Sequence, residues 1–357
     1  MSHQMSGVQL DSRIGACRDA CTSRRLLQAL AGVWAFLAAS VAFAQSGAAQ
    51  WTSIQAAAKK EGRVVLYSAT PPALGNRLLA GFRKVHPDIA VEFTRGPSGE
   101  LLTKIGQEQA SGTDGADVFI STEVEWFKAR AREGKLLKVA GPELSGWPAK
   151  YLRDGAVVTA GLEPFTITYN TKLVTSNPPS SYADMLRPEY KGRLGTSELA
   201  ATTLIAWYDW LEKTQGRDYL QKLRAQNPKL YNGTTPLAQS LAAGEIAVGA
   251  FGNITSFKPL IDQGAPIKYV IPNPGLGFEY AMGGMGWSKR PNATLVFMDY
   301  VMSKDGQTAW HGTGEGASPR SDVAGSIPIG NITAWDTAAY PSDVVTKYRA
   351  YWSGIFK

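Results

Sequence analysis

The sequence predicts an α/β fold built as two lobes. After residue 62, short runs rich in β-branched and aromatic residues alternate with segments whose large apolar residues recur at helical spacing. This alternation is typical of a parallel sheet covered by helices. A strand expected over 165–170 and a second alternating segment over about 182–265 indicate that the chain crosses into a second lobe and later returns.

The first lobe is predicted from three strands, each followed by a helix. The strands are expected over 63–68, 89–94 and 117–120, and the helices over about 74–82, 101–105 and 126–133. Ligands of open α/β sheets bind beyond the carboxyl ends of the strands, close to helix N-termini. The loops that follow the strands are therefore the places where a binding site is expected.

The second lobe is expected over 165–266, after a first lobe over 45–164. Thr235 followed by Pro236 predicts the start of one of its helices, with Thr235 as the cap. Residues 245–251 are expected to form a strand. Runs over 267–272 and 278–287 are expected to return the chain to the first lobe, so that 267–357 form the return and the C-terminal helices.

The N-terminus carries the pattern of a secretory signal peptide. Arg24 and Arg25 precede an apolar stretch over 26–43, which ends in the small-x-small sequence Ala42-Phe43-Ala44. The apolar stretch is about eighteen residues long, so its length alone also allows a membrane anchor. We expect residues 1–44 to be a signal peptide cleaved after Ala44, which places the protein in the periplasm.

Cysteine usage and charge narrow the function. Cys17 and Cys21 both precede the expected cleavage site, so the remaining 313 residues contain no disulfide framework and no thiolate metal site. Those residues carry a net charge of +5, spread without the basic stripe that nucleic-acid binding requires. No GxSxG, HExxH or P-loop pattern occurs. The sequence therefore gives no sign of an enzyme, of a nucleic-acid partner, or of a bound metal or cofactor. Its modest positive charge favours anionic solutes.

Four segments carry a family resemblance: GRVVLYS over 62–68, YADMLRPEYKGR over 182–193, SLAAGEI over 240–246 and GWSKRPNATLVFMDYVMSKDG over 286–306. In this order, across nearly all of 51–320, they resemble the extracellular solute-binding proteins of the ferric-iron-type ABC importer group. The resemblance implies a two-lobed type II periplasmic-binding-protein fold, with hinge-linked lobes that close on a ligand without catalysis. It also implies a monomer that delivers its solute to an inner-membrane ABC permease.

The sequence departs from the ferric members of that group, which typically hold iron with two adjacent tyrosines helped by His and Glu. The corresponding segment here reads Phe251-Gly252-Asn253, and the loop after the first strand lacks the usual histidine. Hard ferric ion prefers anionic oxygen ligands, whereas these loops offer hydroxyls and amides. We therefore expect a small anionic solute, such as a carboxylate, a phosphonate or a sugar phosphate. Ferric iron and a secreted enzyme are the alternatives.

Six candidate ligand-binding residues lie at or after the ends of strands of the first lobe. Arg95 can bind a carboxylate or phosphate bidentately, although a surface arginine at a strand end is the competing interpretation. Ser98 and the amide of Gly99 can face an anion at a helix start, although Ser98 can equally be an ordinary N-cap. The remaining candidates are the hydroxyl residues Ser68, Thr70 and Thr122.

Seven more candidates belong to the second lobe and the return segment. Small, hydroxyl-rich loops at helix starts can cradle an anion, or they can simply cap the helices. From these loops we select Thr196, Ser197, Thr202, Asn232 and Gly233. Asn253 offers a side-chain amide after the strand over 245–251. Tyr280 can close one wall, although a buried aromatic residue is more often part of the core.

Overall fold

The computed structural model describes residues 48–199 and 202–357. The predicted signal peptide over 1–44 lies outside the described residues. The chain divides into two compact units, Met1–Ser53 and Ile54–Lys357. The described residues of the first unit, 48–53, are helical, and everything below concerns the second. Within the described ranges, no helix is both long and apolar enough to cross a membrane.

Two separate sheets form the framework. The first contains β1 (Arg63–Ser68), β2 (Ala90–Arg95), β3 (Val118–Ser121), β4 (Leu152–Arg153), β5 (Val157–Pro164), β11 (Gly275–Gly284) and β12 (Ile332–Ala334). Its order is β2-β1-β3-β11-β5-β4, with β12 pairing with β11. Strands β1, β2 and β3 are parallel, whereas β11 runs antiparallel to β3 and β5. The carboxyl ends of β1, β2 and β3 therefore meet at one edge of this sheet.

The second sheet has the order β10-β6-β9-β7-β8. Its strands are β6 (Ile167–Asn170), β7 (Leu194–Ser197), β8 (Lys229–Tyr231), β9 (Val248–Gly249) and β10 (Ile267–Val270). Strands β7, β8 and β9 are parallel, and β6 and β10 close the sheet with antiparallel pairs. The sequence-predicted alternation of strands and helices is thus confirmed in both halves.

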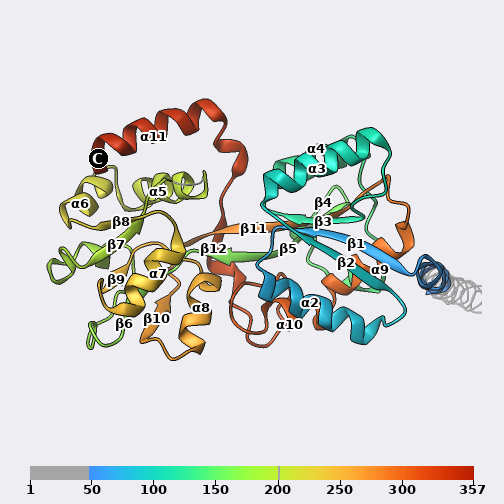
Figure 1. Cartoon of the computed structure of the whole chain (residues 1–357), viewed down its shortest axis with the longest axis horizontal. Coiled ribbons are helices and arrows are strands. Elements are labelled where there is room, and N and C mark those ends of the chain that lie inside the picture. The colour runs from blue at the N-terminus through green and yellow to red at the C-terminus, as the bar shows by residue number, and fades with distance from the viewer. Residues whose placement is uncertain (1–47, 200–201) are drawn as a thin grey trace, which may run out of the picture. The chain divides into compact units, whose positions relative to one another are not determined.

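Helices follow most of the parallel strands. The helices grouped with the first sheet are α2 (Pro72–Val85), α3 (Ser98–Ser111), α4 (Val124–Arg132), α9 (Pro291–Met302) and α10 (Lys304–His311). The helices grouped with the second sheet are α5 (Thr202–Gln215), α6 (Tyr219–Ala225), α7 (Thr234–Ala243), α8 (Ile254–Asp262) and α11 (Ser342–Phe356). We call each sheet with its helices the first lobe and the second lobe. Figure 1 shows β5, β11 and β12 lying between the two groups of helices.

Three segments connect the lobes: β5 to β6, β10 to β11, and β12 to α11. The first two are tied together, since the Phe165 amide donates to the Leu276 carbonyl at 2.8 Å. The amide of Thr166 donates to the carbonyl of Gly252 at the same distance, which attaches this crossing to the end of β9. Hinges consist of a few loop or element-terminal residues, and these short crossing segments are of that kind.

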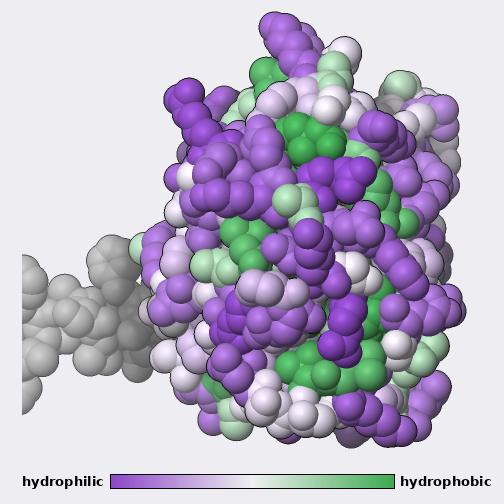
Figure 2. Space-filling model, turned by 90° about the vertical axis from the view of Figure 1, so that its left-hand side faces the viewer, coloured by the Kyte–Doolittle hydropathy of each residue, from purple (hydrophilic) through white to green (hydrophobic). Residues whose placement is uncertain are grey.

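One expected boundary needs correction, and the C-terminal helix can now be assigned to a lobe. Residues Ile267–Val270 pair with β6 of the second sheet, so the chain rejoins the first sheet only at Gly275. The C-terminal helix α11 belongs with the second lobe, because Trp352 and Phe356 are buried in the same apolar cluster as Trp207 and Tyr208 of α5. The physical reason is that these aromatic side chains face the apolar surface of α5. Figure 2 views this lobe from its outer side, where apolar residues form small separate patches on a mostly hydrophilic surface.

Candidate functional site

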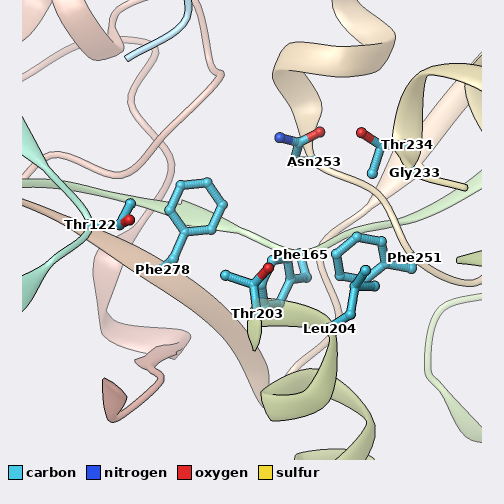
Figure 3. A pocket seen from close by; sticks show the side chains of 9 residues that line it. All are labelled: Thr122, Phe165, Thr203, Leu204, Gly233, Thr234, Phe251, Asn253 and Phe278. Carbon is cyan, nitrogen blue, oxygen red and sulfur yellow. The ribbon is translucent and has the colours of Figure 1, made fainter. Parts of the chain in front are cut away.

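A pocket of about 290 Å³ lies where residues of the two lobes meet (Figure 3). The first lobe contributes Thr122, directly after β3, and Phe278 of β11. The crossing segment and the second lobe contribute the other lining residues: Phe165, Thr203, Leu204, Gly233, Thr234, Phe251 and Asn253. The N-terminal ends of α5, α7 and α8 thus converge on one pocket.

The start of α7 is shaped by Gly233. This residue caps the helix with φ 107° and ψ 174°, a backbone conformation that glycine adopts without strain. The expectation that Thr235 caps the helix is therefore wrong, because α7 begins one residue earlier at Thr234. No side chain caps α7 within the described residues, so its first amides remain available as donors beside the pocket.

A chain of side-chain hydrogen bonds joins the starts of α7 and α8. The hydroxyls of Thr234 and Ser256 lie 2.9 Å apart, and the Ser256 hydroxyl donates to the side-chain oxygen of Asn253. That bond fixes the amide so that its Nδ2 donor is directed elsewhere. Asn253 does not cap α8 through its side chain, and its Nδ2 has no hydrogen-bond acceptor among the described residues. Asn253, which lines the pocket, therefore has a donor that no acceptor of the described residues occupies.

The opposite wall of the pocket is aromatic. The ring centroids of Phe165 and Phe251 are 4.9 Å apart, and those of Phe165 and Phe278 are 5.8 Å apart. Phe165 and Phe251 are 1% and 5% exposed, whereas Phe278 is only half-buried. Leu204 in the first turn of α5 extends this apolar surface. Figure 3 shows the three rings on one side, with Asn253 and Thr234 on the other.

Three hydroxyls surround the carboxyl end of β3 in the first lobe. The Ser121 hydroxyl donates to that of Ser98 at 3.0 Å, and the Ser98 and Thr122 hydroxyls are 3.4 Å apart. Ser98 is the first residue of α3 rather than its cap, because Pro97 occupies the cap position. The capping interpretation of Ser98 is therefore wrong. Its hydroxyl instead connects α3 to Thr122, which reaches the pocket.

A buried carboxylate lies next to the pocket along the chain. Glu163 of β5 is 3% exposed and accepts a 2.6 Å hydrogen bond from the hydroxyl of Thr255 in α8. Its other oxygen, Oε2, has no hydrogen-bond partner among the described residues. Burial raises the pKa of Glu163 to about 7, and the negative charge of Glu315 contributes to the rise. Glu163 thus links a first-lobe strand to the second lobe through a carboxyl group that titrates near neutrality.

The structure brings three of the sequence-predicted site residues into the pocket: Thr122, Gly233 and Asn253. Thr202 is the first residue of α5, directly before the lining residue Thr203. Ser98 adjoins the pocket only through its contact with Thr122.

Five predicted residues are buried beside the strands instead of lining the pocket. Ser68 and Thr70 bond to each other at 2.9 Å, and the Thr196 hydroxyl is 2.8 Å from that of Tyr208. The Ser197 hydroxyl is buried and lacks a partner in the described part of the chain. Tyr280 is 5% exposed, and burial raises its pKa well above the ordinary value.

Arg95, Gly99 and Asn232 are exposed and do not line the pocket. Arg95 ends β2 at the same sheet edge as Thr122. Its positive charge acts on the hydroxyl of Tyr280 and lowers that pKa, against the larger effect of burial. Asn232 lies on another surface depression, next to Trp352 and Lys357 of the C-terminal segment. Of the two residues expected from this loop, Gly233 lines the pocket and Asn232 does not.

Sequence reasoning missed the apolar wall. Phe165, Phe251 and Phe278 were all expected only as strand residues. The one available signal was their position at the strand-to-strand crossings and at a strand end, where side chains of both lobes come together. In the described ranges, no group of three or more His, Cys, Asp or Glu side chains could hold a metal ion.

Comparisons with known proteins agree with this architecture. The profile of the family described as bacterial extracellular solute-binding protein matches residues 77–339, well over half of the chain. An Fe(3+)-binding periplasmic protein of Serratia marcescens is 26% identical over 268 residues, covering 71% of this chain and 77% of that protein.

Two solved structures show the same fold. The substrate-binding protein of an ABC transporter from Agrobacterium tumefaciens has a TM-score of 0.67 at 17% identity, covering 83% of this chain and 94% of that one. AfuA from Actinobacillus pleuropneumoniae, with fructose-6-phosphate bound, has a TM-score of 0.57 at 20% identity, covering 83% and 98%. The two sheets and their crossings thus form the type II periplasmic-binding-protein fold. This chain belongs to the family of bacterial extracellular solute-binding proteins.

Proposed function

We propose that the protein is the periplasmic receptor of an ABC importer and that it binds a small anionic solute in the pocket between its lobes. The family and the fold support a solute-binding role. The main support for an anionic solute is the Nδ2 donor of Asn253, which has no acceptor among the described residues and lies beside the start of α7, which no described side chain caps. Amide donors and the positive ends of helix dipoles favour negatively charged oxygens.

A carboxylate, phosphonate or sugar phosphate suits this lining better than ferric iron. The polar lining residues offer neutral hydroxyls and one amide. Ferric ion is a hard cation that prefers anionic oxygen ligands, and the positive helix ends repel it. Ferric iron is the alternative solute, because the Serratia relative is an Fe(3+)-binding protein. In that case a synergistic anion would have to supply the missing iron ligands.

Closure of the lobes is the proposed response to the solute. Thr122 and Phe278 come from the first lobe, whereas Asn253 and Thr234 come from the second. A ligand that touches both sets stabilises the conformation in which they lie together, and its differential affinity for that state drives closure. The closed, loaded receptor is then the form that docks on the inner-membrane permease. The protein acts as a monomer in this scheme.

A thermal-shift screen of the purified protein tests the proposal. The panel contains carboxylates, phosphonates, sugar phosphates and ferric salts. A solute that binds only the folded protein raises the melting temperature in proportion to ln(1 + [L]/Kd). We expect at least one anion to raise it and ferric ion alone to leave it unchanged. A shift with ferric ion alone, together with a red tyrosinate colour, would contradict the anion assignment. Turnover of a hydrolase panel without any shift would contradict the receptor function itself.

A further inference from the structure

The pocket has two chemically unlike walls, and a fully hydrophilic anion would satisfy only one of them. Figure 3 shows Asn253 and Thr234 facing the pocket from one side and the rings of Phe165, Phe251 and Phe278 from the other. Phe165 belongs to the crossing segment, Phe251 follows β9, and Phe278 belongs to β11.

The aromatic wall leaves apolar surface accessible within the pocket. Phe165 and Phe251 are buried against each other, and Phe251 also packs on Trp207 with centroids 5.0 Å apart. Phe278 is only half-buried, although the neighbouring strand residues Gly277 and Glu279 are buried. An apolar group placed over Phe278 and Leu204 would remove this surface from water, which is favourable in proportion to the area covered.

The polar wall determines the sign of the ligand's charge. Aromatic rings also attract quaternary ammonium groups through their faces. Here, however, the starts of α7 and α8 direct the positive ends of their dipoles toward the same pocket, and Asn253 adds a donor. A cation would be repelled by the polar wall, whereas an anion is attracted by it.

The size of the pocket fits a compact molecule with a ring. A cavity of about 150 Å³ lined by apolar side chains accommodates benzene. The pocket of about 290 Å³ has room for one ring and one anionic head group.

We propose that the solute is a small amphipathic organic anion. A ring-sized apolar body lies against Phe165, Phe251 and Phe278, and one carboxylate or phosphonate group lies between Asn253 and the start of α7. This inference rests on the proposed function and specifies the chemical class of its solute.

Calorimetric titration with matched probes tests the inference. Benzoate, phenylphosphonate and cyclohexanecarboxylate carry an apolar ring, whereas acetate, inorganic phosphate and fructose 6-phosphate do not. We expect each ring-bearing anion to bind at least tenfold more tightly than acetate or phosphate, and benzyltrimethylammonium not to bind. Equal affinity of benzoate and acetate, or tighter binding of fructose 6-phosphate than of every ring-bearing probe, would overturn the amphipathic class while leaving an anion receptor intact. Binding of benzyltrimethylammonium with no binding of any anion would overturn the proposed function as well.

Variants locate the apolar subsite. Phe278→Ala should reduce the affinity for benzoate at least tenfold and change that for acetate less than threefold. Phe278→Leu keeps most of the packing volume and should bind benzoate with an affinity between those of the wild type and the alanine variant. This variant provides the test if Phe278→Ala folds poorly. Phe93→Ala is the matched control, because Phe93 is a half-buried residue of β2 outside the pocket. Equal loss of benzoate affinity in Phe93→Ala and Phe278→Ala would contradict the assignment of the ring to this wall.

Discussion

The hydroxyl of Thr255 donates a 2.6 Å hydrogen bond to the carboxylate of Glu163, which connects β5 of the first lobe to the first turn of α8 in the second. This contact lies next to Phe165 and Asn253 in the sequence, and both of those residues line the pocket. The hydrogen bond between the lobes therefore lies, on both of its sides, two positions along the chain from a residue that lines the pocket.

Glu163 makes the stability of the protein depend on pH. Burial raises its pKa from the ordinary 4.5 to about 7. Between pH 4.5 and pH 7, the carboxyl group of Glu163 is ionised in the unfolded chain but keeps its proton in the folded protein. The stabilising effect of that proton is complete below pH 4.5 and is lost as the pH rises through 7. The expected contribution is about 3 kcal/mol, from about 1.4 kcal/mol per unit of pKa change.

Glu163→Gln removes this titration and keeps the acceptor for Thr255. Its free energy of unfolding should match that of the wild type at pH 4 and exceed it by up to about 3 kcal/mol at pH 8. Denaturant unfolding of both proteins between pH 4 and pH 8 measures this difference in the free energy of unfolding. The contributions of all other titrating groups are common to both proteins and cancel in the difference. A difference that does not vary with pH would contradict the buried, protonated carboxyl group.

The C-terminal helix is predicted to be essential for the stability of the second lobe. Trp352 is 1% exposed, and its ring lies 4.7 Å from Phe356 and 5.7 Å from Tyr208. Trp352→Ala should lower the free energy of unfolding by about 3–5 kcal/mol, because it leaves a large cavity. The exposed neighbour Tyr351→Ala is the control and should cost less than half as much. Equal effects of the two substitutions would show that α11 is not packed as described.

The first lobe is predicted to contact the solute through Thr122. Thr122→Val keeps the shape of the side chain and removes its hydroxyl. Affinity for the anion that gives the largest thermal shift should fall about threefold to tenfold, in line with the loss of one hydrogen bond. Thr94→Val on β2 is the matched control, since Thr94 is half-buried outside the pocket. Unchanged affinity of Thr122→Val would indicate that only the second lobe holds the solute.

Arg95 is predicted to act on the solute by its charge, from outside the pocket. It is exposed at the end of β2, yet its charge reaches Tyr280. Arg95→Ala should weaken anion binding about tenfold, or about 1.4 kcal/mol. Arg95→Lys should recover part of the loss, while Arg83→Ala on α2 should change little. Calorimetry of the three variants at low and moderate salt measures this, and an effect of Arg83→Ala equal to that of Arg95→Ala would reduce the role of Arg95 to net charge.

The alternation of strands and helices could be predicted from sequence because each parallel strand is a compact β-rich run followed by leucines at helical spacing. Strand β5 could not be predicted from the sequence. It is buried along its whole length, and its mixture of Val, Thr, Ala, Gly and Glu shows neither the alternation of a half-buried strand nor a continuous apolar run. That strand carries Glu163, so the carboxyl group at the hinge went unpredicted with it.

The sequence indicated some polar residues of the candidate site but not its apolar wall. Loops after strands indicated Thr122, Gly233 and Asn253, which all line the pocket, because strand order determines which sheet edge a loop occupies. The apolar wall depends on how two crossing segments pack, which no local pattern of Phe165 or Phe278 encodes. Ser68, Thr70 and Thr196 occupy the expected loops or strand ends, but their side chains bond inward. The direction of a side chain at a strand end is decided by tertiary packing.

The central claim is that the amide of Asn253 receives an anion at the meeting point of the two lobes. Calorimetric titration of Asn253→Asp, using the anion with the largest thermal shift, tests it most directly. This substitution keeps the shape of the side chain, removes the Nδ2 donor and adds a negative charge, whereas Asn232→Asp adds the same charge on an exposed residue outside the pocket. We predict that Asn253→Asp weakens binding at least tenfold and that Asn232→Asp changes it less than threefold. Equal affinities of Asn253→Asp and the wild type would contradict the account.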